Sequence, residues 1–271
     1  MSIKLMYITN SVEIAKIAQR AGVDRIWVDL EYIGKEERQG GMDTVKSHHT
    51  VEDIKKIRPY IVESELMVRV NPMHEGSEHE INAVIEAGAD LIMLPMFKQV
   101  EEVERFLNIV DNRKRTILLV ETKEAVEHLD EILKVQGIDE VHIGLNDLHL
   151  SYGRKFMFEL LADGTVDKII EKIKKYQYKY GFGGVARIGY GMLPAEMILR
   201  EHYRLKSEMA ILSRSFCNAN KMTNYEEIEK LFMREVSKIR NEEKIISKLS
   251  NFELKENRNL VCNKVEEIIS N

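Results

Sequence analysis

The sequence has little of what marks several large classes of protein. Only two of its 271 residues are cysteines, Cys217 and Cys262; they are too few for a disulfide framework and lack zinc-site spacing, so we expect free thiols in a reducing compartment. No apolar run approaches the ~18 residues of a membrane-spanning helix, and the first residues lack the pattern of a secretion signal. The 40 basic and 45 acidic residues are interspersed, so no basic stripe fits a phosphate backbone. These absences predict a cytoplasmic protein that binds neither nucleic acid nor membrane.

What the sequence does have is a regular alternation of short aliphatic runs and longer amphipathic segments, which is typical of βαβ units. The chain is also close to the ~250 residues of an eight-fold βα barrel. We predict eight strands, at 4–8, 25–30, 66–70, 91–94, 116–120, 140–143, 183–188 and 209–213. Helical patterns lie between them at 12–21, 51–61, 78–87, 100–110, 123–135, 165–180 and 194–203.

One phrase recurs where a predicted helix gives way to a strand. It reads Ala21-Gly22-Val23-Asp24, then Ala87-Gly88-Ala89-Asp90, then Gln136-Gly137-Ile138-Asp139. Glycine is the residue that most readily adopts the left-handed conformation that ends a helix. The repeat indicates one reused building block, as in a barrel. An open doubly wound sheet is the alternative, but Thr9-Asn10-Ser11 lacks the glycine-rich phosphate motif expected there.

Two stretches depart from the alternation. Residues 34–50, which include His48 and His49, are too long for a simple connection, and long βα loops usually carry function or are disordered. Both histidines, with His149 near another predicted loop, are candidates for proton transfer, and their spacing does not choose between them. From residue 224 onward the pattern is helical, and its apolar stripe needs a surface to cover. We therefore predict a barrel at 1–223 and a helical extension at 224–271 for packing or oligomerisation.

Two carboxylates stand where predicted strands end, the edge at which βα barrels place their sites. Glu121 follows the aliphatic run 116–120, and Asp147 follows the run 140–143. If these runs are neighbouring parallel strands, both acids emerge at the same end of the sheet, and carboxylate oxygens are the ligands that divalent cations prefer. The pair predicts a metal site. The alternative is that each acid caps the helix that follows it.

Arginines at the same strand ends are candidates for anion binding. Arg69 lies within an apolar strand pattern, where an inward arginine must be paired or face a ligand. Arg187 and Arg214 follow the seventh and eighth predicted strands, where barrels often bind phosphate. Ion pairs with Asp29 or Glu31 at the end of the second strand are the alternative for these two.

The order of these residues resembles the metal-dependent pyruvate aldolase and citrate lyase β-subunit family, the HpcH/HpaI aldolases. The matching segments lie between about residues 1 and 215 and include Asp29-Leu30-Glu31, Val68-Arg69-Val70-Asn71, Gly88 to Pro95, Leu119-Val120-Glu121-Thr122 and Gly144-Leu145-Asn146-Asp147-Leu148. The resemblance implies a (β/α)8 TIM barrel of the phosphoenolpyruvate/pyruvate-binding type. It also implies Glu121 and Asp147 as ligands of magnesium or manganese, and Arg69 as the contact for a carboxylate or enolate oxygen.

One position departs from the family pattern. Aldolases of this family carry Asp-x-Glu-His after the second strand, and here the last residue is Tyr32. We therefore expect Asp29 and Glu31 to order bound water, with His48 or His49 supplying the missing proton transfer, unless the chain performs a different reaction on the same enolate. As substrate contacts we add Asn71, Ser213, Arg187 and Arg214, the two arginines at the far anionic end.

These residues predict a divalent-metal-dependent carbon–carbon lyase or aldolase that acts on 2-keto acids and aldehydes. Segments in 144–216 also resemble a subgroup from bacterial surface-polysaccharide gene sets, which implies a sugar-derived or phosphorylated substrate. The family resemblance further implies a homo-oligomer, a trimer or hexamer. Two alternatives stay open, namely an enzyme that uses phosphoenolpyruvate on the same barrel and a non-catalytic relative that binds ligands.

Overall fold

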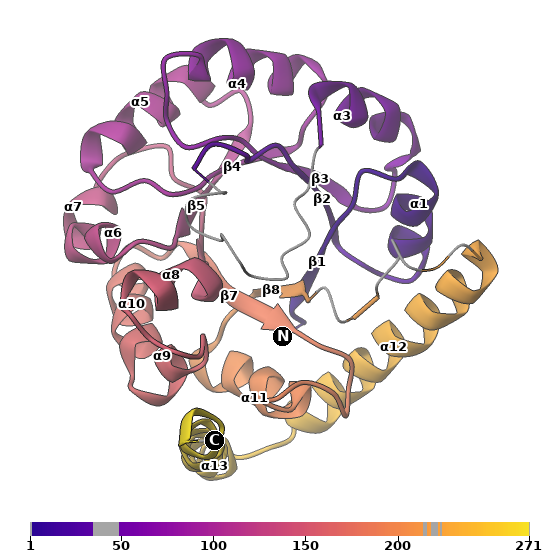
Figure 1. The fold of residues 1–271 in the computed structure, drawn as a ribbon, viewed down its shortest axis with the longest axis vertical. Helices are drawn as coiled ribbons and strands as arrows, with labels where there is room; N and C mark the ends of the chain where they lie inside the picture. The colour runs from indigo at the N-terminus through magenta and orange to yellow at the C-terminus, as the bar shows by residue number, and fades with distance from the viewer. Residues whose placement is uncertain (1, 35–48, 214–215, 218–221, 223, 271) are drawn as a thin grey trace.

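Eight parallel strands close into a barrel, and the helices form an outer ring around it (Figure 1). The structure is a computed structural model that describes residues 2–34, 49–213, 216–217, 222 and 224–270. Neighbouring strands pair in chain order, and β8 closes the barrel onto β1. The strands are β1 (Lys4–Ile8), β2 (Arg25–Asp29), β3 (Glu65–Arg69), β4 (Leu91–Leu94), β5 (Arg115–Val120), β6 (Glu140–Ile143), β7 (Lys179–Val185) and β8 (Met209–Leu212).

The helices of the outer ring bury their apolar faces against the strands, which confirms the predicted (β/α)8 barrel. They are α1 (Val12–Arg20), α3 (Val51–Ile57) with the 3-10 turn η1 (Arg58–Tyr60), α4 (Ser77–Glu86), α5 (Val100–Val110), α6 (Lys123–Glu127), α7 (Leu129–Ile132), α8 (Leu145–Ser151), α9 (Glu159–Ala162), α10 (Thr165–Lys174) and α11 (Ala195–Leu205). The large hydrophobic core lies between strands and helices, and a smaller cluster that includes Trp27, Met67 and Leu119 fills the barrel.

The repeated helix-to-strand phrase folds the same way each time. Gly22, Gly88 and Gly137 have φ of +90°, +97° and +97°, the left-handed conformation that the sequence predicted. The aspartate that ends each phrase then accepts a backbone N–H at the start of an adjacent strand. Asp24 accepts from Leu5 at 2.7 Å, and Asp90 and Asp139 accept from Leu66 and Thr116 at 2.8 Å. The phrase therefore fixes strand register as well as ending a helix.

The seventh repeat differs most from the predicted boundaries. The helix expected at 165–180 ends at Lys174, and β7 begins at Lys179 rather than at residue 183. Gln177 has φ +60°, a left-handed turn that stops the helix. After it Tyr180 packs into the core, so burial of an aromatic residue outweighs the helical pattern that precedes it. The short helices α8 and α9 were not predicted, and the helix expected at 123–135 is interrupted at His128.

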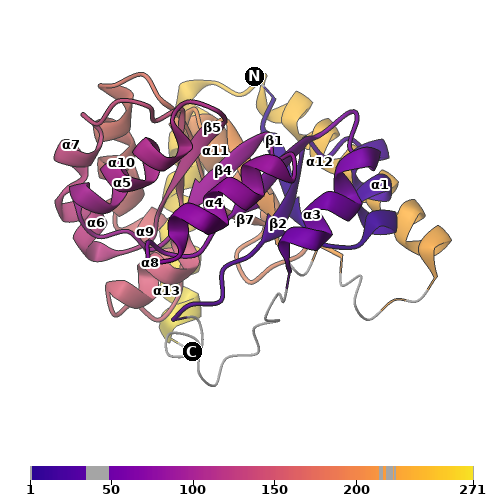
Figure 2. The same ribbon diagram turned by 90° about the horizontal axis from the view of Figure 1, so that it is seen from above.

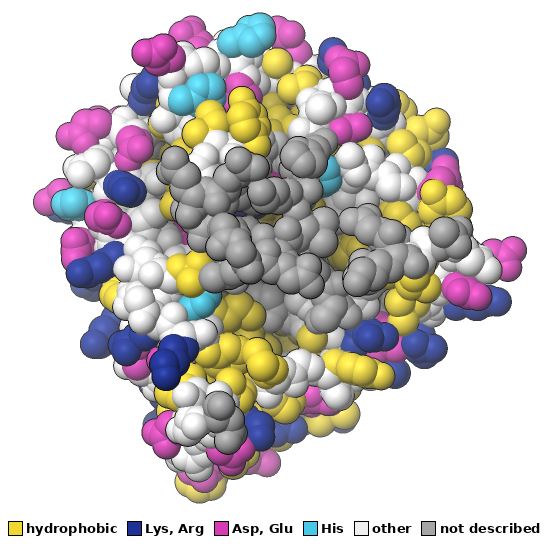
Figure 3. Space-filling model, viewed as in Figure 1, with side chains coloured by type: hydrophobic (Ala, Val, Ile, Leu, Met, Phe, Trp, Pro, Cys, Tyr) yellow, Lys and Arg dark blue, Asp and Glu magenta, His cyan; other side chains and the backbone are white. Residues whose placement is uncertain are grey.

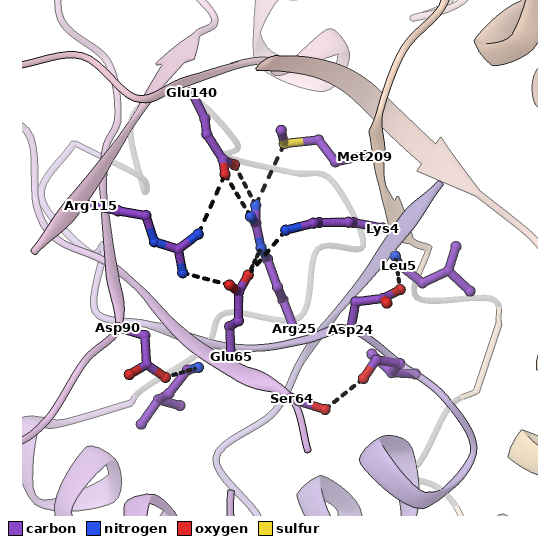
Figure 4. Close-up of polar contacts among 12 residues, drawn as sticks. Lys4, Leu5, Asp24, Arg25, Ser64, Glu65, Asp90, Arg115, Glu140 and Met209 are labelled. Carbon is purple, nitrogen blue, oxygen red and sulfur yellow. Dashed lines mark hydrogen bonds and ion pairs between the residues drawn. The ribbon is translucent and has the colours of Figure 1, made fainter. Parts of the chain in front are cut away.

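A closed network of charges fills the N-terminal end of the barrel (Figure 4). The fully buried Arg25 donates to both carboxylate oxygens of Glu140, at 2.6 and 2.7 Å, and through Nε to Glu65 at 2.8 Å. Arg115 and Lys4 complete the network around Glu65. Burial alone would raise the pKa of the Glu65 carboxyl, but the hydrogen bonds from Arg25 and Arg115 outweigh it and lower the pKa to about 2.

Two C-terminal helices, α12 (Tyr225–Ile246) and α13 (Asn251–Ser270), lie against the outside of the barrel (Figures 1 and 2). The apolar stripe of α12 is buried, and Phe232 contacts Tyr7 edge to face with ring centroids 4.9 Å apart. Glu243 also accepts the backbone N–H of Ile3 at 2.7 Å. Contacts of α13 run to α9 and α11. Within the described residues, no helix has the length and apolar character required to span a membrane.

Candidate active site

Arg69 is held rigidly at the C-terminal end of β3. Its Nε and Nη2 donate to the two carboxylate oxygens of Asp29, each at 2.8 Å, and Nη1 lies 3.1 Å from Glu31 Oε2. The guanidinium also lies over the ring of Trp27, with Cζ 5.2 Å from the centroid. Because β2 and β3 pair in register at Asp29 and Arg69, the sheet itself creates this bidentate ion pair. The structure thus brings three predicted residues together and adds Trp27, which sequence reasoning did not select.

The charges around Arg69 determine its protonation state. Burial alone would lower the pKa of the guanidinium, but the carboxylates of Asp29, Glu31 and Glu121 outweigh it and raise the pKa well above its ordinary value. The Glu121 carboxylate, which follows β5, is close enough to contribute to this rise in the Arg69 pKa. Glu121 therefore lies at the same end of the barrel as Arg69. Arg69 is therefore a permanent cation surrounded by acids.

Glu121 is buried immediately after β5, with only 2% of its surface exposed. Its Oε1 accepts the backbone N–H of Met96, at 3.1 Å, and Met96 has the unusual φ of +54°. Its Oε2 lies against Gly144, where an added Cβ would come within 2.8 Å of that oxygen. Glycine at the end of β6 therefore lets the carboxylate take this position, because an added Cβ would make it shift.

Asp147 lies in the first turn of α8, three residues after Gly144. This differs from the expectation that it directly ends a strand, since an unpredicted helix begins between them. Gly144 is the N-cap and has no side-chain cap, and its N–H is donated to Val120 O at 2.9 Å. The strand β5 thus satisfies this N–H group, and Asp147 is the acidic residue in the first turn of the helix.

The acids fit a divalent cation in their chemistry. Glu121 and Asp147 offer hard carboxylate oxygens, and Gly144 leaves open the space beside Glu121 Oε2. In the described part of the chain, no group of three or more acidic, histidine or cysteine side chains is arranged to hold a metal. A cation here would have two protein carboxylates, with the remaining positions filled by substrate and water.

Asn71 holds the loop that follows β2. Its Oδ1 accepts the backbone N–H groups of Tyr32 and Ile33, at 2.9 and 3.1 Å. Its backbone N–H and its amide Nδ2 both donate to Glu80, at 3.1 and 2.9 Å, and His74 lies 3.1 Å from the other oxygen of Glu80. The Tyr32 side chain is 65% exposed. Sequence reasoning expected a substrate contact at Asn71 and did not foresee this positioning role.

His49 is the predicted histidine that lies against the site. Its Nδ1 accepts the backbone N–H of Asp29 at 3.0 Å, so the neutral ring carries its proton on Nε2. His48 lies outside the described residues. His149 is buried within α8, with Nδ1 3.2 Å from Leu145 O. His142 is enclosed in the barrel, and its burial lowers its pKa to about 3, so it is neutral.

The predicted anion contacts lie after β7 and β8. Arg187 comes two residues after β7, and its Cζ is 4.4 Å from the ring centroid of Tyr190. Ser213 follows β8, and its N–H is donated to Val185 O at 2.8 Å. Arg214 lies outside the described residues. In Figure 3, which shows this face, charged side chains surround the periphery.

Curated proteins with a similar sequence include aldolases. The chain is 26% identical, over 179 residues, to the 2-keto-3-deoxy-L-rhamnonate aldolases of Escherichia coli K12 and Shigella dysenteriae serotype 1; each match covers 54% of this chain and 60% of the relative.

Similar folds occur in solved structures. An HpcH/HpaI aldolase/citrate lyase family protein from Burkholderia cenocepacia superposes with a TM-score of 0.63 at 14% identity, covering 88% of this chain and 95% of the other. The HpcH/HpaI aldolase from Desulfitobacterium hafniense gives 0.59 at 16% identity, covering 93% and 95%. At these identities the similarity establishes the fold alone.

The sequence profile of the HpcH/HpaI aldolase/citrate lyase family matches residues 4–160, which include β1 to β6 and the residues Asp29, Arg69, Glu121 and Asp147. Because this match spans more than half of the 271 residues, the protein belongs to the HpcH/HpaI aldolase/citrate lyase family.

Proposed function

We propose that the protein is a carbon–carbon lyase that makes or breaks the bond between the carbons α and β to the keto group of a 2-keto acid through a pyruvate-type enolate. The observation that carries this proposal is the fixed Arg69 guanidinium beside the buried carboxylate of Glu121. Cleavage moves the bonding electrons toward the keto oxygen and releases an aldehyde. A preorganised cation beside that oxygen lowers the barrier, typically by about 3 kcal/mol for one such contact.

In this proposal Arg69 binds the carboxylate or enolate oxygen of the pyruvyl unit. Of its five N–H groups, two are donated to Asp29, and Nη1 lies 3.1 Å from Glu31 Oε2. We assign the remaining Nη N–H groups to the substrate. Asp29 and Glu31 hold the guanidinium in place and order water beside it. Because substrate and transition state meet the same fixed donors, little reorganisation is needed during the reaction.

Proton transfer is assigned to water oriented by His49, since Tyr32 replaces the family histidine. With Nδ1 accepting the Asp29 N–H, Nε2 is the ring nitrogen that we assign to the water. His48 stays a second proposal for this role. The proton leaves the hydroxyl of the substrate during cleavage and is returned to the methylene carbon of the enolate.

Glu121 and Asp147 are the residues that would hold magnesium or manganese. When bound, the cation would supply Lewis acidity at the keto oxygen. Asn71, Ser213, Arg187 and Arg214 are retained as proposed substrate contacts, with the position of Asn71 maintained by Glu80.

We also propose that residues 1–223 form the catalytic domain, and that the extension at 224–271 contributes to assembly of a trimer or hexamer in the cytoplasm. The exposed side chains of Met233 and Phe252, on α12 and α13, are consistent with an assembly surface.

The test needs no knowledge of the aldehyde. Pyruvate in deuterium oxide should exchange its methyl protons in the presence of the protein and magnesium or manganese, as measured by proton NMR, and a chelator should stop the exchange. The matched variant is Arg69→Lys, which keeps the charge but loses the bidentate pair with Asp29. Phosphate release from phosphoenolpyruvate without pyruvate exchange would favour the phosphoenolpyruvate alternative. Binding of pyruvate without exchange would indicate a non-catalytic relative.

A further inference from the structure

Arg187 differs from every other arginine in the part of the chain that the structure describes. All the others donate a hydrogen bond or form an ion pair. Among the described residues Arg187 has neither, although its Nε is buried; Arg200 Nε is also buried without a hydrogen bond, but Arg200 pairs with Glu242. A buried donor without a partner costs roughly 1–3 kcal/mol, and more when the group is charged. An arginine left in this state at the C-terminal face of a barrel indicates a ligand.

The loop that carries Arg187 is fixed by its own contacts. Gly189 and Gly191 have φ of +81° and +101°, which other residues rarely adopt. The N–H of Gly189 is donated to Glu196 Oε1 at 2.8 Å, and Tyr190 O accepts from Ala195 N at 3.2 Å. This arrangement presents the Tyr190 ring to one face of the guanidinium. The arginine is therefore preorganised, and its binding of an anion would cost little conformational entropy.

The position of the loop relates it to the substrate end of the barrel. Arg187 follows β7, which pairs with β8, and Ser213 at the end of β8 donates its N–H to Val185. Barrels commonly bind anionic groups at the ends of these two strands. Hydrophobic side chains gather on this face near α11 (Figure 3), and Tyr190 and Met192 in the loop are 54% and 67% exposed. The Arg187 guanidinium thus lies against Tyr190, an exposed aromatic residue that a ligand can reach.

Arg69 already serves the pyruvyl unit in the proposed function, and its pairing with Asp29 and Glu31 leaves Arg187 for a different anion. We propose that Arg187, supported by Tyr190, determines specificity for a second anionic group, a carboxylate or a phosphate, on the part of the substrate remote from the keto acid. This inference rests on the proposed function. It assigns the protein a substrate class, 2-keto acids with a negatively charged far end, and excludes neutral sugar acids as its best substrates.

The competing explanation lies in the first turn of α11, the helix that follows the loop. Glu196 Oε2 is also buried without a hydrogen-bond partner, and Oε1 of the same carboxylate accepts the N–H of Gly189 in the loop, so Glu196 is the candidate for an internal partner of Arg187. An internal ion pair of this kind would satisfy both groups and remove the need for a ligand. The experiment must therefore distinguish a bound anionic ligand from the carboxylate of Glu196.

Trp27 provides a measurement that does not depend on turnover. It is the single tryptophan of the chain, and its ring lies 5.2 Å from Arg69 Cζ, so its fluorescence should report ligands bound at Arg69. The ligands, titrated in the presence of magnesium, form two matched pairs. One pair is 2-oxoadipate and 2-oxohexanoate, which differ in a terminal carboxylate. The other is 2-keto-3-deoxy-6-phosphogluconate and its unphosphorylated form.

The charged member of at least one pair should bind roughly 10- to 100-fold more tightly than its neutral counterpart, as expected for one charge-assisted hydrogen-bonded contact. Arg187→Met should remove this preference and leave the affinity for the neutral member unchanged. Arg187→Lys, which keeps the charge without the planar donors, should retain part of it. Arg200→Met is the control, because Arg200 lies on α11 and pairs with Glu242 at 3.8 Å, and the preference should persist in that variant.

The outcomes separate the two proposals. If neutral and charged keto acids bind equally to the unmodified protein, or if Arg187→Met keeps the preference, the inference about the second anion is wrong while the proposed function stands. If no 2-keto acid changes the Trp27 fluorescence, the proposed function fails, and the inference fails with it. If Glu196→Gln alone creates the preference, Arg187 is bound by Glu196 in the native protein and the inference is overturned. The ligand pair that shows the difference in affinity tells whether the second anionic group is a carboxylate or a phosphate.

Discussion

Both ends of the barrel contain charged side chains, but the pairing of these charges differs between the two ends. At the N-terminal end, Arg25 is fully buried and satisfied by Glu65 and Glu140, and Arg115 and Lys4 complete the network. Every charge of this network has a partner of opposite sign. The network fills the interior of the barrel at this end.

At the C-terminal end, the described residues include several acids and two arginines whose pairing differs. Asp29, Glu31, Glu121 and Asp147 are four carboxylates, and Arg69 is the cation that the first two hold. Carboxylate oxygens suit a divalent cation. Arg187, which has no ion pair within the described part of the chain and lies against Tyr190, suits an anion. The difference between the ends shows why charge at a barrel end does not by itself indicate a site.

The largest expected effect is on stability at the closed end. Glu140→Ala removes both hydrogen bonds from Arg25 Nη1 and Nη2 to that carboxylate, and a buried charge that loses its main partner typically costs about 3–5 kcal/mol. Urea unfolding should show this loss. Glu52→Ala is the control, because its pair with Lys55 is exposed and should contribute less than about 1 kcal/mol. Equal effects of the two substitutions would contradict the distinction.

At the open end the effect should fall on activity instead. Glu121→Ala removes a proposed metal ligand and the acceptor of the Met96 N–H. We expect pyruvate exchange to fall by about 10²- to 10³-fold, the range for losing one preorganised electrostatic contact. NMR exchange rates and urea unfolding should be measured on the same preparation. Exchange that persists with unchanged metal dependence would remove Glu121 from the site.

The free energy of unfolding should depend on pH through two buried histidines, His142 and His202. Burial lowers the pKa values of His142 and His202 to about 3, with charges of Arg25 and His142 as smaller causes. Since an unfolded histidine titrates near about 6.5, the unfolded chain binds more protons below that pH. Stability is therefore complete above pH ~6.5 and falls as the pH drops toward ~3, by up to about 1.4 kcal/mol per pH unit for each histidine.

The measurement is the unfolding free energy between pH 5 and 8. His142→Gln should reduce the slope below pH ~6.5 by about half, because one of the two histidines no longer titrates. A matched substitution of the exposed His79 should leave the slope unchanged. A slope that is the same in all three proteins would show that the buried histidines do not control acid stability.

The smallest expected effect tests the close approach at Gly144. In Gly144→Ala the new Cβ would lie 2.8 Å from Glu121 Oε2, so the carboxylate must move. Displacing one ligand by a fraction of an ångström should slow pyruvate exchange by about 10-fold, with little change in unfolding. Gly184→Ala is the control, since its Cβ would be at an ordinary 3.4 Å from Ser213. Similar rates for both variants would show that the Gly144 contact has no catalytic consequence.

Much of the fold was predictable because its signals are local. Seven of the eight strands lie within one residue of the predicted limits, and the three helix-ending glycines adopt the expected conformation. The exception is β7, where the helical pattern continues past the turn at Gln177. The role of Asp24 and its two equivalents was not predictable, because each accepts its hydrogen bond from a residue 19 to 24 positions away.

Prediction of the site was incomplete for the same reason. The sequence indicated Arg69 and Glu121 as charged residues at strand ends, but it did not distinguish partners from ligands. Asn71 was selected for the substrate, whereas the structure shows it holding the loop at Tyr32 through its side chain. Gly144 gave no signal of its own, because its importance comes from the carboxylate that lies against it.

The sequence by itself determined the eight-fold alternation, the repeated turns and the placement of acids and arginines after the strands, since periodicity and turn chemistry act over a few residues. Only the tertiary structure decided which charges neutralise one another. Barrel closure sets Arg25 against Glu140, 115 positions away, and the register of β2 and β3 sets Arg69 against Asp29. It also leaves Arg187 beside Tyr190 with no ion pair among the described residues. Pairing depends on distances that a linear sequence does not contain.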